Sequence, residues 1–298
     1  MTAILRKDFS ELVRSAKFRE SLVISQGLAI VWWAAALWLR SLNLIPVWHD
    51  QSTTFTQVNA HLFDPYQVRG FVYPPWTGFL LIPFGLLPLP LATLAQMCLY
   101  FAFLTGVIFK FGGNRRTMLI TLTSFIALDA ALELNIDWLV CLGLLVPPAF
   151  SGPFLLVKPQ NALGYWLSFK RREFVRAVIA VMALLIVSLI VWGLWPLQML
   201  DAIRVNTLGR SYNLAPLALL PWPVALAIGL GLGWIAFKRR DPVLSILAWL
   251  FFVPYTTLYA LLQPLALFAI RYPRVALLIS VVVWILYGGV LARYFLHF

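Results

Sequence analysis

The chain has 298 residues, of which 62% are hydrophobic and only 11% are charged, and its mean hydropathy is +0.87. This composition excludes a soluble globular domain and predicts a polytopic membrane protein. The net charge of +12 does not require nucleic acid as a partner, because basic residues collect in the cytoplasmic loops of membrane proteins, where they meet anionic lipid.

Several apolar runs approach or exceed the roughly 20 residues that a helix needs to cross a hydrocarbon core of about 30 Å. The runs are apolar on every face, which is typical of bundled helices and not of a membrane barrel. We therefore predict an all-α polytopic membrane protein, a single transmembrane domain over residues 1–298 with about nine to eleven transmembrane helices. Cys98 and Cys141 lie inside apolar runs without metal or disulfide spacing and are expected to be packing residues.

Residues 1–20 are predicted to form a helix that lies flat on the cytoplasmic surface of the plasma (inner) membrane. Between residues 3 and 18 the apolar side chains share one helical face and the basic side chains lie elsewhere. The first spanning helix is expected from about Ser21 to Leu39, with tryptophans toward its far end, and it carries no cleavable signal pattern. The N-terminus is then cytoplasmic, and residues 41–76 form an external loop with juxtamembrane helices.

The external loop contains the longest polar interval of the chain, residues 49–76. The residues in it that suit catalysis or binding are His49, Asp50, His61, Asp64, Arg69 and the turn Tyr73-Pro74-Pro75-Trp76. A loop at the end of a membrane helix can present a carboxylate to a substrate that arrives along the bilayer, so we expect the chemistry here. The alternative is a solvated loop with a proline turn. The histidines and aspartates match no common metal-site spacing, so no metal is expected.

Two apolar stretches leave the helix count open. Residues 73–109 are broken by prolines and are expected to form two short helices with a turn at Leu87-Pro88-Leu89-Pro90. If both helices span, the basic residues at 110–116 lie outside. If the first is a re-entrant hairpin, they lie inside, as the positive-inside rule prefers. Residues 138–169 form either one span or two short spans divided at Pro147-Pro148.

Beyond residue 170 the hydropathy pattern predicts five further spans. They are expected near 177–195, from about 214 to 237, and at roughly 242–256, 258–270 and 275–295. The segment between the first two of these spans is external. Basic clusters between apolar runs set the orientation, so the positive-inside rule places the following residues in the cytoplasm: Lys170-Arg171-Arg172, Lys238-Arg239-Arg240, Arg271 and Arg274.

Three acidic residues within an apolar region form a second group of candidates. Asp129, Glu133 and Asp137 are spaced i, i+4, i+8, so a continuous helix would align their carboxylates on one face. Ionisable residues inside a membrane usually face a cavity or a basic partner. They indicate a functional site here, with a buried structural pair as the alternative.

Basic residues are candidates for binding an anion. Lys158 interrupts an apolar run, where it could hold a lipid phosphate or only extend to the membrane interface, and the sequence alone favours the second role. Arg204 and Arg210 lie in the predicted external segment, where few basic residues are expected, and a guanidinium fork suits phosphate oxygens. The chain has no Walker, dinucleotide-binding, serine-hydrolase or zinc-protease motif, so we expect no cofactor and a substrate that comes from the membrane.

An ordered set of short motifs runs through the first half of the chain. Asp50 follows the first predicted helix, Pro65-Tyr66 comes next, and Tyr73-Pro74-Pro75 enters the apolar run GFLLIPFGLLPLP. Glu133-Leu134-Asn135 and Lys158-Pro159-Gln160 follow. In this order the motifs resemble those of the C-type membrane glycosyltransferases, particularly glycosyltransferase family 87, the polyprenyl-phosphate-mannose-dependent mannosyltransferases. The likeness covers roughly residues 20–170, but the family's Gly-Gln pair is missing and the chain is short for the family.

The resemblance implies transfer of a hexose, such as mannose, from a polyprenyl-phosphate sugar to an acceptor glycan, lipid or protein, with inversion, on the extracytoplasmic face. By motif match, Asp50 becomes the catalytic general base, and no general acid is required because phosphate is already a good leaving group. The substrate-binding residues are expected among Tyr66, Arg69, Tyr73, Lys158, Gln160, Arg204 and Arg210. Glu133 or Asp137 would supply a second acidic group.

The missing Gly-Gln pair and the short chain favour one alternative, a catalytically reduced, transferase-like membrane subunit. Such a subunit would bind lipid or scaffold a membrane-protein complex. A carrier is a weaker alternative, because carriers often show repeated halves and this sequence shows none. Turnover of a polyprenyl-linked sugar separates the enzyme from the subunit.

Overall fold

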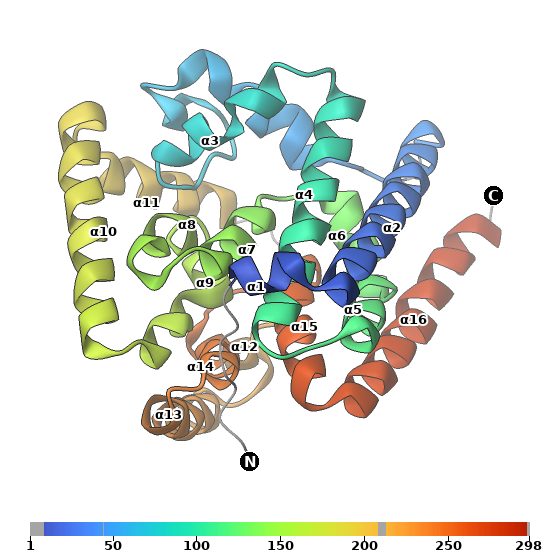
Figure 1. Ribbon diagram of the computed structural model, residues 1–298. Coiled ribbons are helices and arrows are strands. Elements are labelled where there is room, and N and C mark those ends of the chain that lie inside the picture. Colours follow the sequence, from blue (N-terminus) through green and yellow to red (C-terminus); the bar gives the residue numbers. More distant parts are fainter. Residues whose placement is uncertain (1–8, 44, 208–212, 297–298) are drawn as a thin grey trace.

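A computed structural model of the chain describes residues 9–43, 45–207 and 213–296 (Figure 1). All regular elements in these ranges are helical, and none of the described residues lies in a strand. The prediction of an all-α protein is thus confirmed for this part of the chain. The predicted surface helix falls partly on residues 1–8, outside the described residues. From residue 9 the chain forms a short helix, α1 (Phe9–Arg14), and a break at Ser15.

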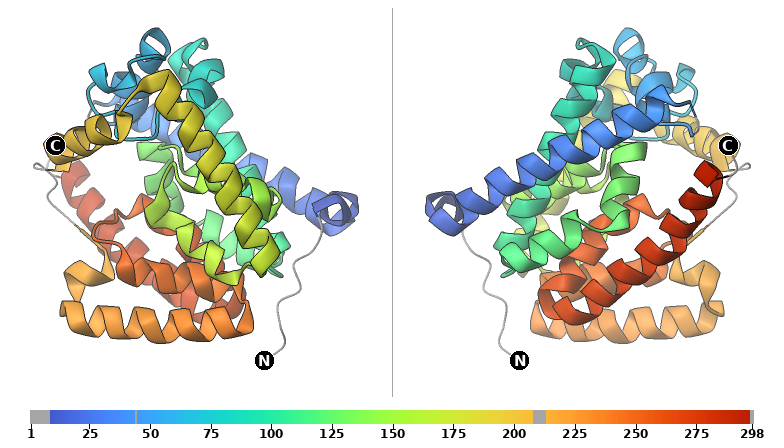
Figure 2. Two further views of the ribbon diagram at one scale, coloured as in Figure 1. Left: turned by 90° about the vertical axis from the view of Figure 1, so that its left-hand side faces the viewer. Right: turned by 90° about the vertical axis from the view of Figure 1, so that its right-hand side faces the viewer.

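Among the described residues, three helices are long and apolar enough to cross a membrane: α2 (Ala16–Ser41), α4 (Leu89–Lys110) and α10 (Arg171–Trp192). The predicted nine to eleven spans are therefore not confirmed. α4 is mostly buried inside the protein and packs against α2, α7 (Asp137–Leu145) and α15 (Leu262–Arg271). α2 and α10 stand at the periphery on opposite sides of α4 (Figures 1 and 2).

The outer faces of the peripheral helices are strongly apolar. Exposed aliphatic and aromatic side chains run along α10, along α13 (Trp222–Arg239) and along α16 (Pro273–Leu296) up to Tyr287. Because exposing such large apolar surfaces to water is unfavourable, they are suited to contact lipid. α13 is seen end-on in Figure 1 and lengthwise in Figure 2, so it lies crosswise to α10 at one end of the bundle.

Prolines and capping residues fix many of the helix ends. α3 (Trp76–Gly85) and α4 are separated by a turn that ends at Pro88, as the proline pattern predicts. Asn114 and Ser124 cap α5 (Arg115–Leu122) and α6 (Phe125–Glu133) by accepting hydrogen bonds from backbone N–H groups at 3.2 Å. Asp241 caps α14 (Pro242–Trp249) and forms an ion pair with Arg271, which joins α14 to α15.

The chain between α5 and α10 is irregular. α6 ends at Glu133 because Leu134 adopts a left-handed conformation, with φ 42°, and α7 begins only at Asp137. The expected column of Asp129, Glu133 and Asp137 on one continuous helix is therefore wrong. After α7 the chain forms only short helical turns: η4 (Pro148–Phe150), α8 (Gly152–Leu155), α9 (Pro159–Ala162) and η5 (Leu163–Ser168). No helix within 138–169 is long enough to cross a membrane by itself, so neither the one span nor the two spans expected there are confirmed.

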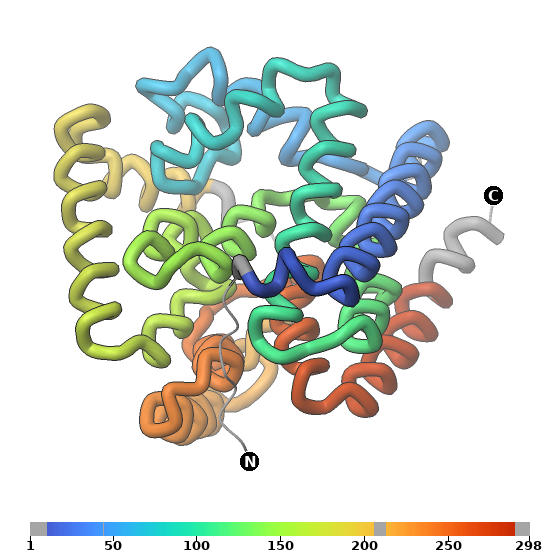
Figure 3. Tube along the Cα trace, in the orientation of Figure 1, coloured from blue at the N-terminus to red at the C-terminus, as the bar shows by residue number. Residues whose placement is uncertain are grey.

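The two ends of the bundle differ in charge. The loop after α2 folds into η1 (Gln51–Phe55), η2 (Val58–His61) and η3 (Pro65–Gln67) beside α3, at the top of Figure 1. The basic turns after α4, before α10, after α13 and after α15 lie at the opposite end, as the trace in Figure 3 shows. α3 has ten residues, too few to cross a bilayer, and it packs against η2 and α4.

Substitution of Gly164 tests how closely the irregular segment is packed. A Cβ atom at Gly164 would clash with the Ser245 carbonyl oxygen and with Trp249 Cβ, so Gly164→Ala should force η5 away from α14. We expect the free energy of unfolding to fall by about 1–3 kcal/mol, as measured by denaturation in detergent. Gly233→Ala on α13 is the control, because its Cβ would meet only Leu167 Cδ1 at 4.0 Å. Equal free energies of unfolding for the Gly164→Ala and Gly233→Ala proteins would contradict this packing.

Candidate functional site

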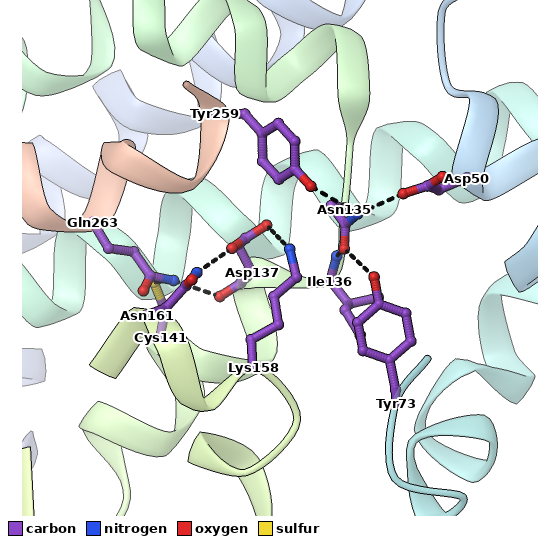
Figure 4. A network of polar contacts seen from close by, with 10 residues as sticks. All are labelled: Asp50, Tyr73, Asn135, Ile136, Asp137, Cys141, Lys158, Asn161, Tyr259 and Gln263. Carbon is purple, nitrogen blue, oxygen red and sulfur yellow. Dashed lines mark hydrogen bonds and ion pairs between the residues drawn. The ribbon is translucent and has the colours of Figure 1, made fainter. Parts of the chain in front are cut away.

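The site is built around the break between α6 and α7, where Asn135 meets Asp50 (Figure 4). Asn135 Nδ2 donates a hydrogen bond to Asp50 Oδ2 at 2.6 Å. Asp50 is half-buried, and its neighbour Gln51 is fully buried and accepts a hydrogen bond from Gln96 of α4 at 2.8 Å. The loop after α2 is thereby fixed to the interior at the residue that follows the carboxylate.

Asn135 also joins two other segments. Its Oδ1 accepts hydrogen bonds from the Tyr73 hydroxyl at 3.0 Å and from the Ile136 N–H at 2.7 Å, and its Nδ2 lies 3.3 Å from the Tyr259 hydroxyl. Burial raises the pKa of Tyr73, so this phenol stays protonated and acts as a donor. One amide therefore connects the first loop, the helix break and the segment before α15.

A buried ion pair lies beside this amide. Lys158 Nζ is 2.9 Å from Asp137 Oδ2, and both side chains are almost inaccessible, at 4% and 2% exposed. Asn161 donates a hydrogen bond to the other oxygen of Asp137. Gln263 of α15 donates to the Asp137 carbonyl oxygen at 2.7 Å and contacts Cys141 Sγ at 3.2 Å. The start of α9 thus holds the Asp137 carboxylate that pairs with the lysine, and α15 holds the Asp137 backbone.

Lys158 and Asn135 border a cavity of about 430 Å³. Its polar part is formed by Tyr73, Asn135, Lys158, Gln160, Thr257 and Tyr259, and its apolar part by residues that include Met199, Ile203, Trp249, Phe252 and Val253. The Lys158 ammonium lies 4.9 Å from the centre of the Tyr259 ring, within cation–π range. A cavity with a cationic polar part and a mostly apolar wall suits an anionic amphiphile.

The structure brings together some of the residues that the sequence singles out. Tyr73, Lys158 and Gln160 line the cavity directly. Asp50 does not border it but reaches it through Asn135, and Asp137 reaches it through Lys158. Lys158, for which the sequence favours an extension to the interface, is instead buried and paired.

Other predicted residues lie elsewhere. Tyr66 and Arg69 line a second cavity of about 440 Å³ together with Asp64 and Asp201, and the Tyr66 hydroxyl donates to the Tyr73 carbonyl oxygen at 2.9 Å. Arg204 is 80% exposed at its side chain and lies 3.4 Å from Asp201. Arg210 lies outside the described residues, and Glu133 is half-buried at the end of α6.

Four residues of the site escape the sequence-based selection: Asn135, Asn161, Tyr259 and Gln263. The first two and the last are uncharged polar residues within apolar surroundings, and burying such groups is costly unless they are hydrogen-bonded. That rule could have marked them as members of a buried network. Their side-chain partners on other segments lie 24 to 126 residues away in sequence and could not be predicted from spacing.

No group of three or more histidine, cysteine, aspartate or glutamate side chains in the described part of the chain could hold a metal ion. His49 and His61 are both exposed in the first loop. Comparison with known proteins found no matching protein family, no matching curated protein and no matching solved structure.

Proposed function

We propose that the protein is a membrane hexosyltransferase that uses a polyprenyl-phosphate sugar as donor and acts on the extracytoplasmic face of the plasma membrane. The single observation that supports this function best is the cavity beside Asp50. It combines a buried lysine with a wall of apolar side chains, which matches a lipid phosphate in chemistry. The motif resemblance points to the same donor, with mannose as the first hexose to test.

In the proposed reaction, an acceptor hydroxyl attacks the anomeric carbon of the donor. The new bond joins the acceptor oxygen to that carbon, the bond from the carbon to the phosphate oxygen breaks, and the configuration is inverted. Asp50 takes the hydroxyl proton as general base. Polyprenyl phosphate leaves with the bonding electrons, and the Lys158 ammonium and the Tyr259 hydroxyl stabilise the charge that develops on it.

The proposed orientation follows the positive-inside rule. With the N-terminus in the cytoplasm, α2 crosses outward, α4 returns and α10 crosses outward again. The basic turns after α4 and before α10 are then cytoplasmic, and the loop with Asp50 is external. In this topology α3 does not span, which corresponds to the second of the two arrangements expected for residues 73–109.

A turnover assay tests this function. Purified protein in lipid nanodiscs is incubated with radiolabelled polyprenyl-phosphate mannose or other polyprenyl-phosphate hexoses, together with a lipid and glycan extract as the source of acceptor. We expect labelled product and free polyprenyl phosphate in equal amounts. Absence of turnover with every such donor, from protein that melts cooperatively, would contradict the proposal.

One observation favours the alternative of a non-catalytic membrane subunit that binds lipid. Asp50 is hydrogen-bonded to Asn135 and does not itself line the cavity, so the site could hold a lipid phosphate without performing chemistry. In that case polyprenyl phosphate binds without turnover, and a stoichiometric membrane partner co-purifies. Turnover by the isolated chain excludes this alternative.

A further inference from the structure

Two residues in strained backbone conformations flank the contact between Asp50 and Asn135. Trp48 has φ 57° and precedes Asp50 by two residues, and Leu134 has φ 42° and directly precedes Asn135. Neither is glycine, and bulky side chains rarely adopt the left-handed region because Cβ crowds the backbone. Such conformations persist only when the surrounding structure fixes them, and they cluster at functional sites.

The two strained residues are tied to each other through α6. The Trp48 backbone N–H donates to the Leu132 carbonyl oxygen at 2.8 Å, and its indole Nε1 donates to the Ala131 carbonyl oxygen at 2.9 Å. These carbonyls belong to the last turn of α6. Carbonyl oxygens in the last turn of a helix have no intrahelical hydrogen-bond partner, so Trp48 supplies the donors that they need. Trp48 thus occupies the end of α6 and stabilises the turn at which Leu134 leaves the helix.

The indole is held from its other side by α2. Trp48 is 1% exposed, and the Arg40 guanidinium lies 5.6 Å from the centre of its ring. Arg40 also donates to the Val47 carbonyl oxygen at 2.7 Å, so the backbone on the N-terminal side of Trp48 is fixed as well. On the C-terminal side, the bond between Gln51 and Gln96 provides the next anchor.

We propose that Trp48 is a positioning residue that sets the distance between Asp50 and Asn135. This inference rests on the proposed function, because it gives Trp48 its importance through the general base. Trp48 lines neither the cavity beside Asp50 nor the second cavity, and it is also absent from the lining of a third cavity of about 450 Å³ next to Arg40 and His49. It therefore acts through Asp50 and not by touching substrate. The left-handed backbone at Trp48 turns the chain so that Asp50 points toward the helix break.

The test uses Trp48→Phe, which removes the indole donor and keeps an aromatic ring. Trp284→Phe is the matched control, since Trp284 Nε1 also donates to a backbone carbonyl, that of Thr123 at 3.0 Å, and it lies on α16 outside the cavity lining. We expect Trp48→Phe to lower kcat at least fivefold while the KM for the donor changes less than twofold. Trp284→Phe should keep kcat even if its melting temperature falls equally.

A second measurement does not depend on turnover. Cysteines placed at Asp50 and Asn135, in a protein whose native Cys98 and Cys141 are replaced with serine, are linked with a short bifunctional thiol reagent, and the rate of linkage is compared with and without Trp48→Phe. We expect linkage to be at least fivefold slower in the Trp48→Phe protein and unchanged in the Trp284→Phe protein. Equal linkage rates overturn the positioning role. Absence of turnover in the wild-type protein overturns only the proposed function.

Discussion

Replacing Asp50 with asparagine is expected to lower the rate of sugar transfer by about 10²–10⁴-fold, the usual contribution of a general base. Asparagine cannot take the hydroxyl proton, but its Oδ1 can still accept the hydrogen bond from Asn135, so the fold should persist. The KM for the donor should change little, because Asp50 does not border the cavity. Initial rates at several donor concentrations measure both quantities.

Asp64→Asn is the matched control for Asp50→Asn. Asp64 is an exposed carboxylate of the same loop, accepts a hydrogen bond from Gln67 and lines the second cavity. It should keep nearly wild-type turnover. Full activity of the Asp50→Asn protein would remove Asp50 as the base, and an equal loss in both variants would indicate a general effect on the loop.

Replacing Asp137 with asparagine is expected to lower the free energy of unfolding by about 3–5 kcal/mol, because it leaves the Lys158 ammonium buried without its counter-charge. Denaturation in detergent measures this change. Substituting both residues, Asp137→Leu with Lys158→Met, should recover most of the stability, since no unpaired charge remains. The double variant should nevertheless bind polyprenyl phosphate more weakly, because the cavity has lost its cation.

The exposed pair of Asp201 and Arg204 provides the control for the buried pair. Its side chains are 72% and 80% exposed, so Asp201→Asn should change the free energy of unfolding by less than about 1 kcal/mol. Equal and small effects of Asp137→Asn and Asp201→Asn would show that the Lys158 ammonium finds water or another partner. The cavity that Lys158 borders would then contain water, despite its mostly apolar lining.

Proline chemistry made part of the fold predictable. The prolines at 88 and 90 place the turn between α3 and α4 correctly, because proline ends or starts helices through its fixed φ and missing N–H. The break at Leu134 carries no such signal. A leucine adopts the left-handed conformation there, within a turn held by the hydrogen bonds of Trp48, which comes from a distant part of the chain.

The number of spans could not be predicted from hydropathy. An apolar run predicts a span whether it faces lipid or other helices, and residues 138–169 are largely buried inside the protein as short turns. Irregular backbone can be buried when the surrounding protein satisfies its polar groups. Lys110 illustrates this, since its ammonium donates to the carbonyl oxygens of Leu144 and Leu145 at 2.9 Å, at the end of α7.

The candidate site was only partly predictable for a related reason. Asp50, Tyr73 and Lys158 could be selected because charged and aromatic groups next to apolar runs attract attention. The connection of Asp50 to Tyr73 through Asn135, and the pairing of Lys158 with Asp137, depend on how segments far apart in sequence pack together. The same packing places Arg69 in the lining of the second cavity. From its position in the loop, Arg69 had been expected to bind the phosphate of the donor.

Photochemical cross-linking of a polyprenyl phosphate tests most directly whether the cavity beside Asp50 holds a lipid-linked donor. A photoreactive polyprenyl phosphate is bound to the protein in nanodiscs, irradiated, and its attachment sites are mapped by mass spectrometry. We expect label on Met199, Trp249 and Phe252 that excess unmodified polyprenyl phosphate removes. Label confined to the exposed faces of α10, α13 and α16, and insensitive to competition, would contradict the proposed site.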